Sequence, residues 1–336
     1  MAKWYNTIGP ESDIIVSSRV RLARNIAGFP FCNKLTAEQR TEINALVKNA
    51  LGSINDPATK NLKFIEMDNV PKAEIYAMVE RHIISPAFAE NSDGRAIILS
   101  EDESVSVMIG EEDHLRIQVL LAGLDLKTAY DMAERIDTLL CERLHFSFHN
   151  TLGYLTECPT NIGTGLRASV MLHLPMLDYV SAMPQLSEAV SKIGFTVRGL
   201  YGEGSKSGAG LYQLSNQITL GITENDAISN LQNVAMQFVS RELDEREKSE
   251  RITLEDNIFR AYGILKNARI ISGKEMMELL SLIKLGSGMG IIDIEKSLPM
   301  QLLVECQPNT LISKYGVTDA ADRDKQRAQV IREKLR

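Results

Sequence analysis

The chain has 336 residues, of which 44% are hydrophobic, and its formal net charge at neutral pH is -7. This composition is typical of a globular protein that is long enough for two domains with cores of their own. The acidic balance argues against a general nucleic-acid binder, and no apolar run is long enough to predict a transmembrane helix. Four widely spaced cysteines and an N-terminus without a signal-peptide pattern favour a reducing cytoplasm.

The spacing of apolar residues predicts the order of the elements. Strands are predicted over residues 14–22, 96–100, 105–109, 115–120, 168–172 and 217–221, and helices over residues 36–51, 128–144 and 226–241. Thr36 followed by Gln39 predicts a capping box at the start of the first helix. Because the strands come in consecutive clusters rather than as βαβ units, we expect an α+β fold with a mainly antiparallel sheet flanked by helices.

The last third of the sequence has a different pattern. Residues 242–251 are dense in charges of both signs, and residues 253–285 are predicted to be helical throughout. A break is expected at the glycine-rich residues 286–290, with further helices after Pro299 and Thr318. We therefore predict one domain over residues 1–245 and an all-helical domain over residues 246–336. The apolar face of residues 270–285 further predicts helix pairing and a homodimer.

Five arginines lie in four short motifs. The motifs are Ser18-Arg-Val-Arg21, Glu111-Glu-Asp-His-Leu-Arg116, Cys158-Pro-Thr-Asn-Ile-Gly-Thr-Gly-Leu-Arg167 and Arg198-Gly-Leu-Tyr-Gly-Glu203. Arginine stays charged and binds phosphate oxygens in pairs, so converging arginines in an acidic protein indicate a site for a compact polyanion such as a nucleoside triphosphate. On their strand, Arg19 and Arg21 share a face about 6.7 Å apart. Two solvated charges on an edge strand are the alternative interpretation.

The other motifs contain candidate catalytic groups. Glu112, His114, Arg116 and Gln118 are predicted to share one face of a strand, either on the surface or in a site. Cys158 precedes a turn with two glycines, where a nearby cation could ionise its thiol, although a buried structural cysteine fits equally well. The glycine-rich residues 204–210 lack the P-loop spacing and indicate a mobile flap. His82, near the end of a helical segment, is by itself typical of a cap or surface residue.

Taken together and in this order, the motifs resemble the ATP:guanido phosphotransferases, the family of arginine and creatine kinases, over residues 14–240. The resemblance implies a guanido kinase/glutamine-synthetase-like catalytic domain that uses ATP and Mg²⁺, without metal ligands from the protein. The nucleotide-binding residues that it implies are Ser17, Ser18, Arg19, Val20, Arg21, His82, Arg116, Arg167, Ala168, Ser169, Val170, Met171, Arg198, Gly199, Leu200, Tyr201, Gly202 and Glu203. It also implies that Glu112 and Glu203 flank the acceptor guanidinium, where either could be the base, and that Cys158 contacts it.

Two departures from the small-molecule kinases favour the branch of the family that phosphorylates arginines in proteins. The strand of Arg19 and Arg21 begins within the first twenty residues, which leaves no room for the helical domain that precedes it in those enzymes. The site is then expected to be open enough for a protein chain. The helical extension also contains Arg323-Asp-Lys-Gln-Arg-Ala328, which resembles a phosphoarginine-binding motif and implies that Arg323, Asp324 and Arg327 hold this ligand.

The resemblance further implies protein substrates with exposed arginines, an activator protein, a Clp ATPase that degrades marked proteins and a transcriptional repressor of a stress response. We expect a cytoplasmic, allosteric enzyme without a membrane or direct nucleic-acid partner. The alternatives are a kinase for free arginine or a similar guanidino compound, and a non-catalytic phosphoarginine-binding adaptor. The presence of Glu112, Cys158 and Glu203 argues against the adaptor. A ligase of glutamine-synthetase architecture would need a metal-binding carboxylate cluster, which the sequence does not contain.

Overall fold

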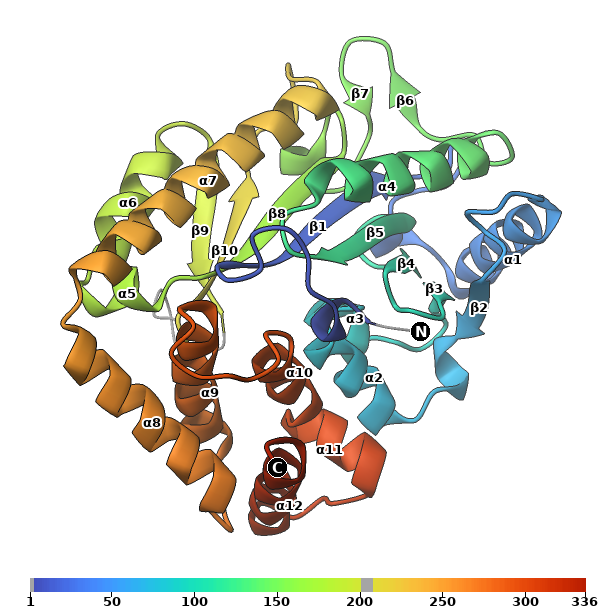
Figure 1. Ribbon diagram of the computed structural model, residues 1–336. Helices are drawn as coiled ribbons and strands as arrows, with labels where there is room; N and C mark the ends of the chain where they lie inside the picture. Colours follow the sequence, from blue (N-terminus) through green and yellow to red (C-terminus); the bar gives the residue numbers. More distant parts are fainter. Residues whose placement is uncertain (1–2, 201–207) are drawn as a thin grey trace.

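The computed structural model describes residues 3–200 and 208–336. At its centre lies an eight-stranded sheet in the order β2-β3-β4-β5-β1-β8-β10-β9, in which every neighbouring pair is antiparallel (Figure 1). The strands are β1 Ile15–Arg24, β2 Leu62–Glu66, β3 Ala96–Ser100, β4 Val105–Ile109, β5 Leu115–Ala122, β8 Leu166–His173, β9 Phe195–Gly199 and β10 Leu211–Asn216, and β6 Phe148–His149 pairs with β7 Gly153–Tyr154 in a separate hairpin. The expected α+β fold is confirmed.

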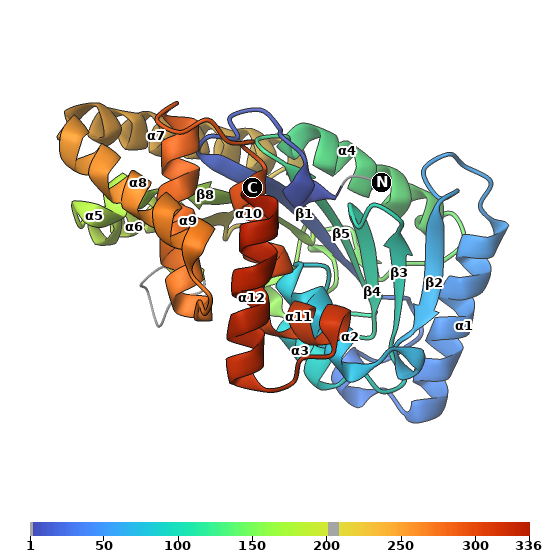
Figure 2. The same cartoon turned by 60° about the horizontal axis from the view of Figure 1, so that its bottom comes forward.

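One face of the sheet is covered by four helices, which bury its apolar side chains. They are α1 Ala37–Ser53, α4 Leu126–Cys141, α6 Met183–Ser191 and α7 Glu224–Lys248. In Figure 2, α4 and α7 lie above the sheet. Val20 and Leu22 of β1 belong to this core, so their neighbours Arg19 and Arg21 face the other side. The predicted capping box is confirmed, because Thr36 and Gln39 each accept a hydrogen bond from the other's backbone.

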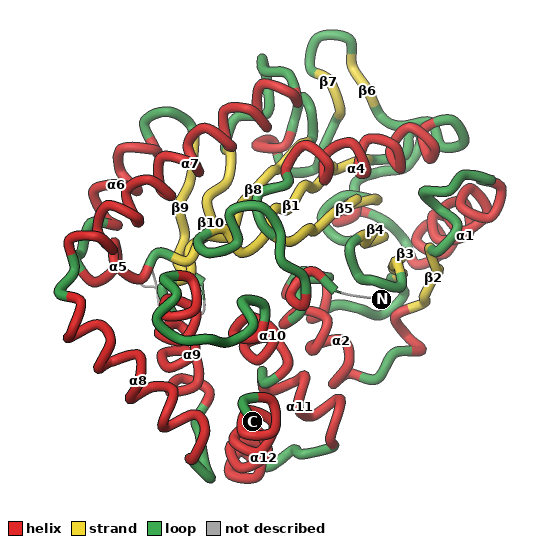
Figure 3. Tube along the Cα trace, in the orientation of Figure 1, coloured by secondary structure: helices red, strands yellow, loops and turns green. Residues whose placement is uncertain are grey.

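The opposite face carries most of the remaining helices. They are α2 Lys72–Glu80, α3 Pro86–Glu90, α8 Arg251–Asn267, α9 Gly273–Gly288, α10 Leu298–Glu305, α11 Pro308–Tyr315 and α12 Ala320–Lys334. The short helix α5 Pro175–Tyr179 contributes Leu177 to the core of the first face and Met176 to the cluster on the opposite one. Figure 3 shows that the chain beyond α7 consists of helices and loops. These C-terminal helices share a buried cluster with Val16, Leu120, Met171 and Leu211 of the sheet. The helical region therefore packs directly on the sheet.

Buried polar contacts reinforce this packing where α5, α7 and α9 meet. Arg246 and Glu242 form a buried ion pair at 2.9 Å on α7, and the Glu242 carboxylate also accepts hydrogen bonds from backbone N–H groups at the start of α5. Lys284 of α9 donates to the carbonyl of Ser12, and the His173 ring lies 2.9 Å from the Ser281 hydroxyl. Because α7 ends at Lys248 and α8 begins at Arg251, the charged segment 242–251 is almost entirely helical.

One predicted strand is wrong. Residues 217–221 form a loop, and the strand of this region is β10, which ends at Asn216. The loop is instead bound to the turn after Cys158: the Thr219 hydroxyl bonds the carbonyls of Thr160 and Ile162, at 2.9 and 2.8 Å. The alternating apolar residues Ile218 and Leu220 are about half exposed, so the alternation has no buried face to match.

The predicted continuous helix over 253–285 is wrong, whereas the break predicted at residues 286–290 is confirmed, because α9 ends at Gly288. The chain leaves α8 at Asn267 and re-enters a helix at Gly273, with the Ser272 hydroxyl capping the new start. Gly286, the first residue of the predicted break, still lies inside α9. A Cβ atom there would come within 2.6 Å of the Ile258 side chain, so this glycine allows α8 and α9 to approach closely.

Candidate active site

The five arginines of the sequence motifs line a single cleft of about 790 Å³ on the face of the sheet opposite α4 and α7. They come from four strands: Arg19 and Arg21 from β1, Arg116 from β5, Arg167 from β8 and Arg198 from β9. These strands lie next to one another or one strand apart in the sheet. Arg19 and Arg198, which are 179 positions apart in sequence, are therefore brought to one site by strand pairing.

The strand register places like charges directly opposite each other. Arg21 pairs with Arg167 across β1 and β8, while on its other side it pairs with Gln118 of β5. Arg116 lies two residues from Gln118 on the same strand. Like charges at opposed positions of an antiparallel pair destabilise a sheet. The arrangement is thus unfavourable for folding by itself, and a bound anion would offset the repulsion.

The arginines differ in how completely the protein satisfies them. Arg116 is paired with Glu111, whose carboxylate also accepts from the Ser85 hydroxyl. Arg19 donates to Gln213 at 2.7 Å. Within the described part of the chain, the Nε atoms of Arg21 and Arg167 are buried without a hydrogen-bond partner. Buried donors without partners are rare and costly, so these two atoms indicate the place of a ligand with acceptor oxygens.

Burial and mutual repulsion lower the pKa values of these guanidinium groups. The pKa of Arg19 falls to about 10, because of desolvation first and then the charges of Arg116 and Arg167. Desolvation and the neighbouring arginines also lower the pKa of Arg21 well below its ordinary value. The pKa of Arg167 is lowered by burial and by Arg198. The cleft therefore concentrates positive charge in a protein of negative net charge.

The same cleft contains two of the predicted catalytic groups. Burial, followed by repulsion from Asp113 and Glu111, raises the pKa of Glu112, which makes its carboxylate a better proton acceptor. The Cys158 sulfur also lines the cleft and lies 3.0 Å from the Thr160 hydroxyl. Gly199 and Leu200 line it as well. Tyr201, Gly202 and Glu203 lie outside the described residues.

His82 lies beside Arg19 and Arg21 in the cleft, two residues after the end of α2. Its φ of 62° is unusual for a residue other than glycine. Its carbonyl accepts a 2.9 Å hydrogen bond from Gln118, and its ring lies 5.8 Å from that of Trp4. Burial and the Arg19 charge lower the pKa of His82 to about 3, so the ring is neutral near pH 7. A neutral ring suits contact with an uncharged base or sugar.

The predicted nucleotide-binding stretches alternate between the two faces of the sheet. Ser17, Ser169 and Met171 share a small cavity with Arg19 and His82. The side chains of Ser18, Val20, Ala168 and Val170 are buried: Val20, Ala168 and Val170 belong to the core, and the Ser18 hydroxyl bonds the Gly123 carbonyl and the Asp125 N–H. These four side chains do not face the cleft, because successive residues of a strand point in opposite directions.

His114 does not share a face with Arg116 and Gln118 as the alternation predicts. The strand β5 begins only at Leu115, and the His114 ring is fully buried between two backbone groups. Its Nδ1 accepts from the Ile26 N–H at 2.9 Å, and its Nε2 lies 2.8 Å from the Pro30 carbonyl. His114 therefore anchors the chain after β1 rather than contributing to the site.

Several residues of the cleft escape the sequence argument. They include Glu80, Ser85, Glu111, Gln213 and Gln307. Glu111 is the first residue of a recognised motif that assigns it no role, whereas Gln213 is placed only by the pairing of β10 with β8 and β9. Gln307 comes from the C-terminal helical region, where no local pattern connects it with the arginines. Among the described residues, no cluster of three or more His, Cys, Asp or Glu side chains could hold a metal ion.

The C-terminal arginine motif forms a different environment on α12. Arg327 is 2% exposed and donates to the carbonyls of Cys306 and Ile271, at 3.0 and 2.9 Å, and it is paired with Asp324. Arg323 is partly buried and donates to the Thr318 carbonyl. The guanidinium of Arg327 is thus engaged in holding α12 against the segments before α9 and after α10. Within residues 3–200 and 208–336, no helix combines the length and the hydropathy that a membrane span requires.

The fold is shared with a solved guanidino kinase. Lombricine kinase superposes with a TM-score of 0.62 at 22% identity, over 74% of this chain and 73% of that protein. The sheet and its flanking helices therefore have the guanidino-kinase fold.

Sequence comparisons specify the family. The model described as "ATP:guanido phosphotransferase, C-terminal catalytic domain" matches residues 42–245, and the one described as "Protein-arginine kinase McsB C-terminal domain" matches residues 251–336. The chain belongs to the ATP:guanido phosphotransferase family. It is similar to two proteins named protein-arginine kinase: one from Halothermothrix orenii, 42% identical over 100% of this chain and 97% of that protein, and one from Brevibacillus brevis, 44% identical over 100% and 95%.

Proposed function

We propose that the chain is a protein arginine kinase, which transfers the γ-phosphoryl group of Mg-ATP to the guanidinium of arginine residues in proteins. The observation that supports this most strongly is the cleft in which five arginines converge and two buried guanidinium Nε atoms have no partner among the described residues. The similarity to two protein-arginine kinases over the full chain gives the acceptor. The opposed arginines need an anionic ligand, and a triphosphate supplies several acceptor oxygens in a compact group.

In this proposal the arginines align and neutralise the triphosphate. Phosphoryl transfer requires mainly positioning and charge stabilisation, because the transition state carries its charge on the phosphoryl oxygens. Arg21 and Arg167 would donate their Nε hydrogens to these oxygens, with Arg19, Arg116 and Arg198 around them. Mg²⁺ would arrive with the nucleotide, bound through the phosphates and water, as is usual for this ion. The neutral His82 would contact the base or the sugar.

The acidic groups of the cleft would prepare the acceptor. A guanidinium is protonated and has no free lone pair at neutral pH, so a nitrogen becomes nucleophilic only as it loses a proton. Glu112, with its raised pKa, would hold the guanidinium and accept that proton. We assign Glu203 the same kind of role on the other side of the acceptor. Cys158 would contact the guanidinium in support, since direct transfer needs no covalent intermediate.

We further propose that the C-terminal motif senses phosphoarginine and couples it to activity. Arg323 and Asp324 are partly exposed and could reach a ligand, while Arg327 would position Asp324 through their ion pair. By the same family resemblance, the mark would direct proteins to a Clp ATPase and inactivate a stress-response repressor in the cytoplasm. An activator protein and a homodimer complete this proposal. Unchanged affinity for phosphoarginine after Arg323→Ala would count against the sensor.

The test of the activity is a comparison of acceptors. The enzyme is incubated with Mg-ATP and either casein or free arginine, and the products are analysed by mass spectrometry under non-acidic conditions, because the N–P bond is acid-labile. Phosphoarginine on casein with little free phosphoarginine is the expected result. Rapid phosphorylation of free arginine alone would instead identify a small-molecule kinase, and no transfer to either acceptor would contradict the proposal.

A further inference from the structure

A joint between α2 and α11 connects the C-terminal helical region to the cleft. Glu80 is the last residue of α2, and its carboxylate accepts four hydrogen bonds from the start of α11. Oε1 accepts from the backbone N–H and the side-chain amide of Asn309, at 2.8 and 2.7 Å. Oε2 accepts from the backbone N–H and the hydroxyl of Thr310, at 2.7 and 2.8 Å. Both carboxylate oxygens are thus fully used by one helix end.

The position of this carboxylate is unfavourable without α11. A negative charge at the C-terminal end of a helix is opposed by the helix dipole, and Glu80 occupies that place on α2. The start of α11 makes the negative charge of Glu80 favourable, because the first N–H groups of α11 lack partners within the helix and carry the positive end of its dipole. The joint therefore orders the end of α2 only when α11 is docked.

The same joint forms part of the cleft wall. Glu80 lines the cleft together with Val79 and His82, and so does Gln307, the residue that precedes α11. Gln307 is 8% exposed, and its side-chain amide donates to the Leu303 carbonyl at the end of α10. One wall of the cleft is therefore built from two parts of the chain that lie more than 220 residues apart.

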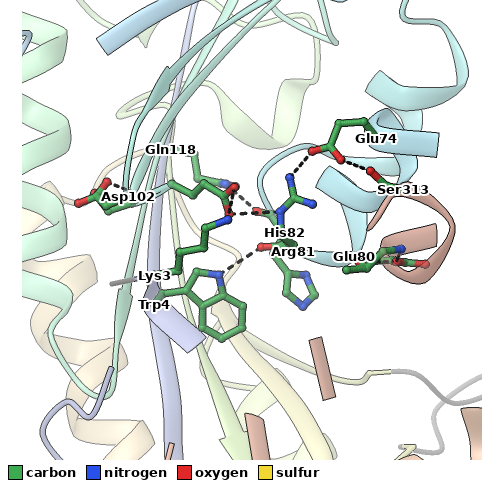
Figure 4. Close-up of polar contacts among 12 residues, drawn as sticks. Lys3, Trp4, Glu74, Glu80, Arg81, His82, Asp102, Gln118 and Ser313 are labelled. Carbon is green, nitrogen blue, oxygen red and sulfur yellow. Dashed lines mark hydrogen bonds and ion pairs between the residues drawn. The ribbon is translucent and has the colours of Figure 1, made fainter. Parts of the chain in front are cut away.

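The turn after Glu80 carries His82 into the cleft in a conformation that needs support. His82 has a positive φ, and the backbone around it is held from several sides (Figure 4). Trp4 donates to the Arg81 carbonyl at 3.2 Å, and Gln118 donates to the His82 carbonyl at 2.9 Å. The Arg81 side chain is ion-paired with Glu74 and Glu103. Glu80 directly precedes this turn, so its four hydrogen bonds to α11 add a further fixed point on the side of α2.

We propose that Glu80 and Gln307 make the start of α11 a part of the nucleotide site, with Glu80 as the positioning residue that fixes His82 and Gln307 as the wall beside it. The inference rests on the proposed assignment of the cleft to ATP. It makes the docked position of the C-terminal helices a condition for tight nucleotide binding, whereas the acceptor-side groups Glu112 and Cys158 belong to other parts of the sheet and its loops.

The test compares three variants of the full chain: Glu80→Gln, Gln307→Ala and the control Ser313→Ala. Ser313 also joins α11 to α2, through a hydrogen bond to Glu74, but it faces a different cavity, lined by Lys3 and Lys314. Glu80→Gln removes the charge and, in either amide orientation, places an N–H₂ group opposite at least one backbone N–H donor, and Gln307→Ala removes the wall while leaving the four hydrogen bonds intact. We expect both to raise the KM and the Kd for Mg-ATP about fivefold. In all three variants, kcat and the KM for the protein acceptor should stay at wild-type values. In Ser313→Ala, the KM and the Kd for Mg-ATP should stay there too.

Trp4, the only tryptophan of the chain, gives a second readout. Its indole bonds the turn that carries His82, so its fluorescence should change when Mg-ATP binds, with the midpoint shifted to higher ATP in Glu80→Gln and Gln307→Ala. Wild-type values of KM and Kd for Mg-ATP in Gln307→Ala, or in a folded Glu80→Gln, would overturn the proposed role of the joint. Equal losses in kcat/KM for ATP and for the protein acceptor would overturn it as well. Arg21→Ala separates the two proposals: if it also left ATP binding unchanged, the assignment of the cleft itself would be wrong.

Discussion

The cleft and the helix α12 both contain arginines in recognisable motifs, but their surroundings differ. In the cleft, Arg21 and Arg167 oppose each other across two strands, and each has a buried Nε without a partner in the described structure. On α12, the whole side chain of Arg327 is buried, yet two backbone carbonyls and Asp324 satisfy it. The first arrangement destabilises the free protein, whereas the second stabilises it.

The comparison shows that a sequence motif gives the residue type, while its partners decide what the residue does. A guanidinium with buried, unused donors is prepared for a ligand, and one whose donors reach carbonyls is part of the structure. Substitutions in the two regions should therefore affect different quantities. Removing a cleft arginine should reduce activity without lowering the free energy of unfolding. Removing Arg327 should lower the free energy of unfolding, while the folded protein keeps its KM for ATP.

The largest effect is expected for Arg21→Ala. The substitution removes a donor aimed at the phosphates, and we expect kcat/KM for Mg-ATP to fall about a thousandfold. The free energy of unfolding, measured by urea denaturation, should stay the same or rise, because a desolvated charge facing Arg167 disappears. Arg21→Lys is the matched control: it keeps a positive charge but loses the planar fork, and should also be strongly impaired. Lower stability with normal activity would contradict the comparison.

Arg327→Ala should have the opposite signature. It leaves Asp324 unpaired and two buried carbonyls without their donor, so we expect a loss of about 3 kcal/mol in the free energy of unfolding. Any protein that remains folded should keep its KM for ATP. The neighbouring Arg323→Ala serves as control, since its side chain is partly exposed, and should cost less than about 1 kcal/mol. An undiminished urea midpoint in Arg327→Ala would show that its buried contacts contribute little.

Glu112→Gln is expected to reduce kcat about a hundredfold while ATP still binds. The raised pKa of Glu112 sets the direction of the pH dependence: the base must be ionised, so the activity of the wild type should fall as the pH decreases through that raised pKa. In Glu112→Gln this acidic limb should be absent from the pH–rate profile. A variant with unchanged kcat, or with the same acidic limb, would remove Glu112 from the mechanism.

The smallest effect concerns the junction between the sheet and α9. Burial, with the charges of Lys284 and Arg246 nearby, lowers the pKa of His173 well below its ordinary value. The unfolded chain therefore binds a proton below about pH 6.5 that the folded chain excludes, and stability should fall by about 1.4 kcal/mol for each further pH unit. His173→Asn should make the fall in urea midpoint between pH 6.5 and 5 shallower. An identical slope in the variant would rule this histidine out as a source of acid sensitivity.

The sequence predicts the strands of Arg19, Arg21 and Arg116, because alternation along a strand is a local property, but it predicts no strand around Arg198, which lies on β9. It also identifies Glu112, Cys158 and His82, which the structure brings into the same cleft as the arginines. The place of Gln213 depends on sheet order and register, which no local pattern determines. The position of Gln307 is even harder to predict from the sequence, because its place in the cleft depends on how α11 docks on α2.

The errors have similar causes. Residues 217–221 alternate like a strand, yet they bind the turn at Thr160 and Ile162 instead of a neighbouring strand. The alternation of residues 112–118 predicts that His114 shares a face with Arg116, but β5 begins one residue after His114. Gly286 opens the predicted break, yet it lies inside α9, where its missing side chain serves a helix–helix contact. In each case a tertiary contact decides the role of the residue.

The most direct test of the account is a crystal structure of the enzyme with Mg²⁺ and a non-hydrolysable ATP analogue. We expect phosphate oxygens within hydrogen-bond distance of the Nε atoms of Arg21 and Arg167, with the terminal phosphate facing Glu112 and Cys158. A nucleotide bound at another surface, or bound here while both Nε atoms keep no contact with the phosphates, would contradict the account.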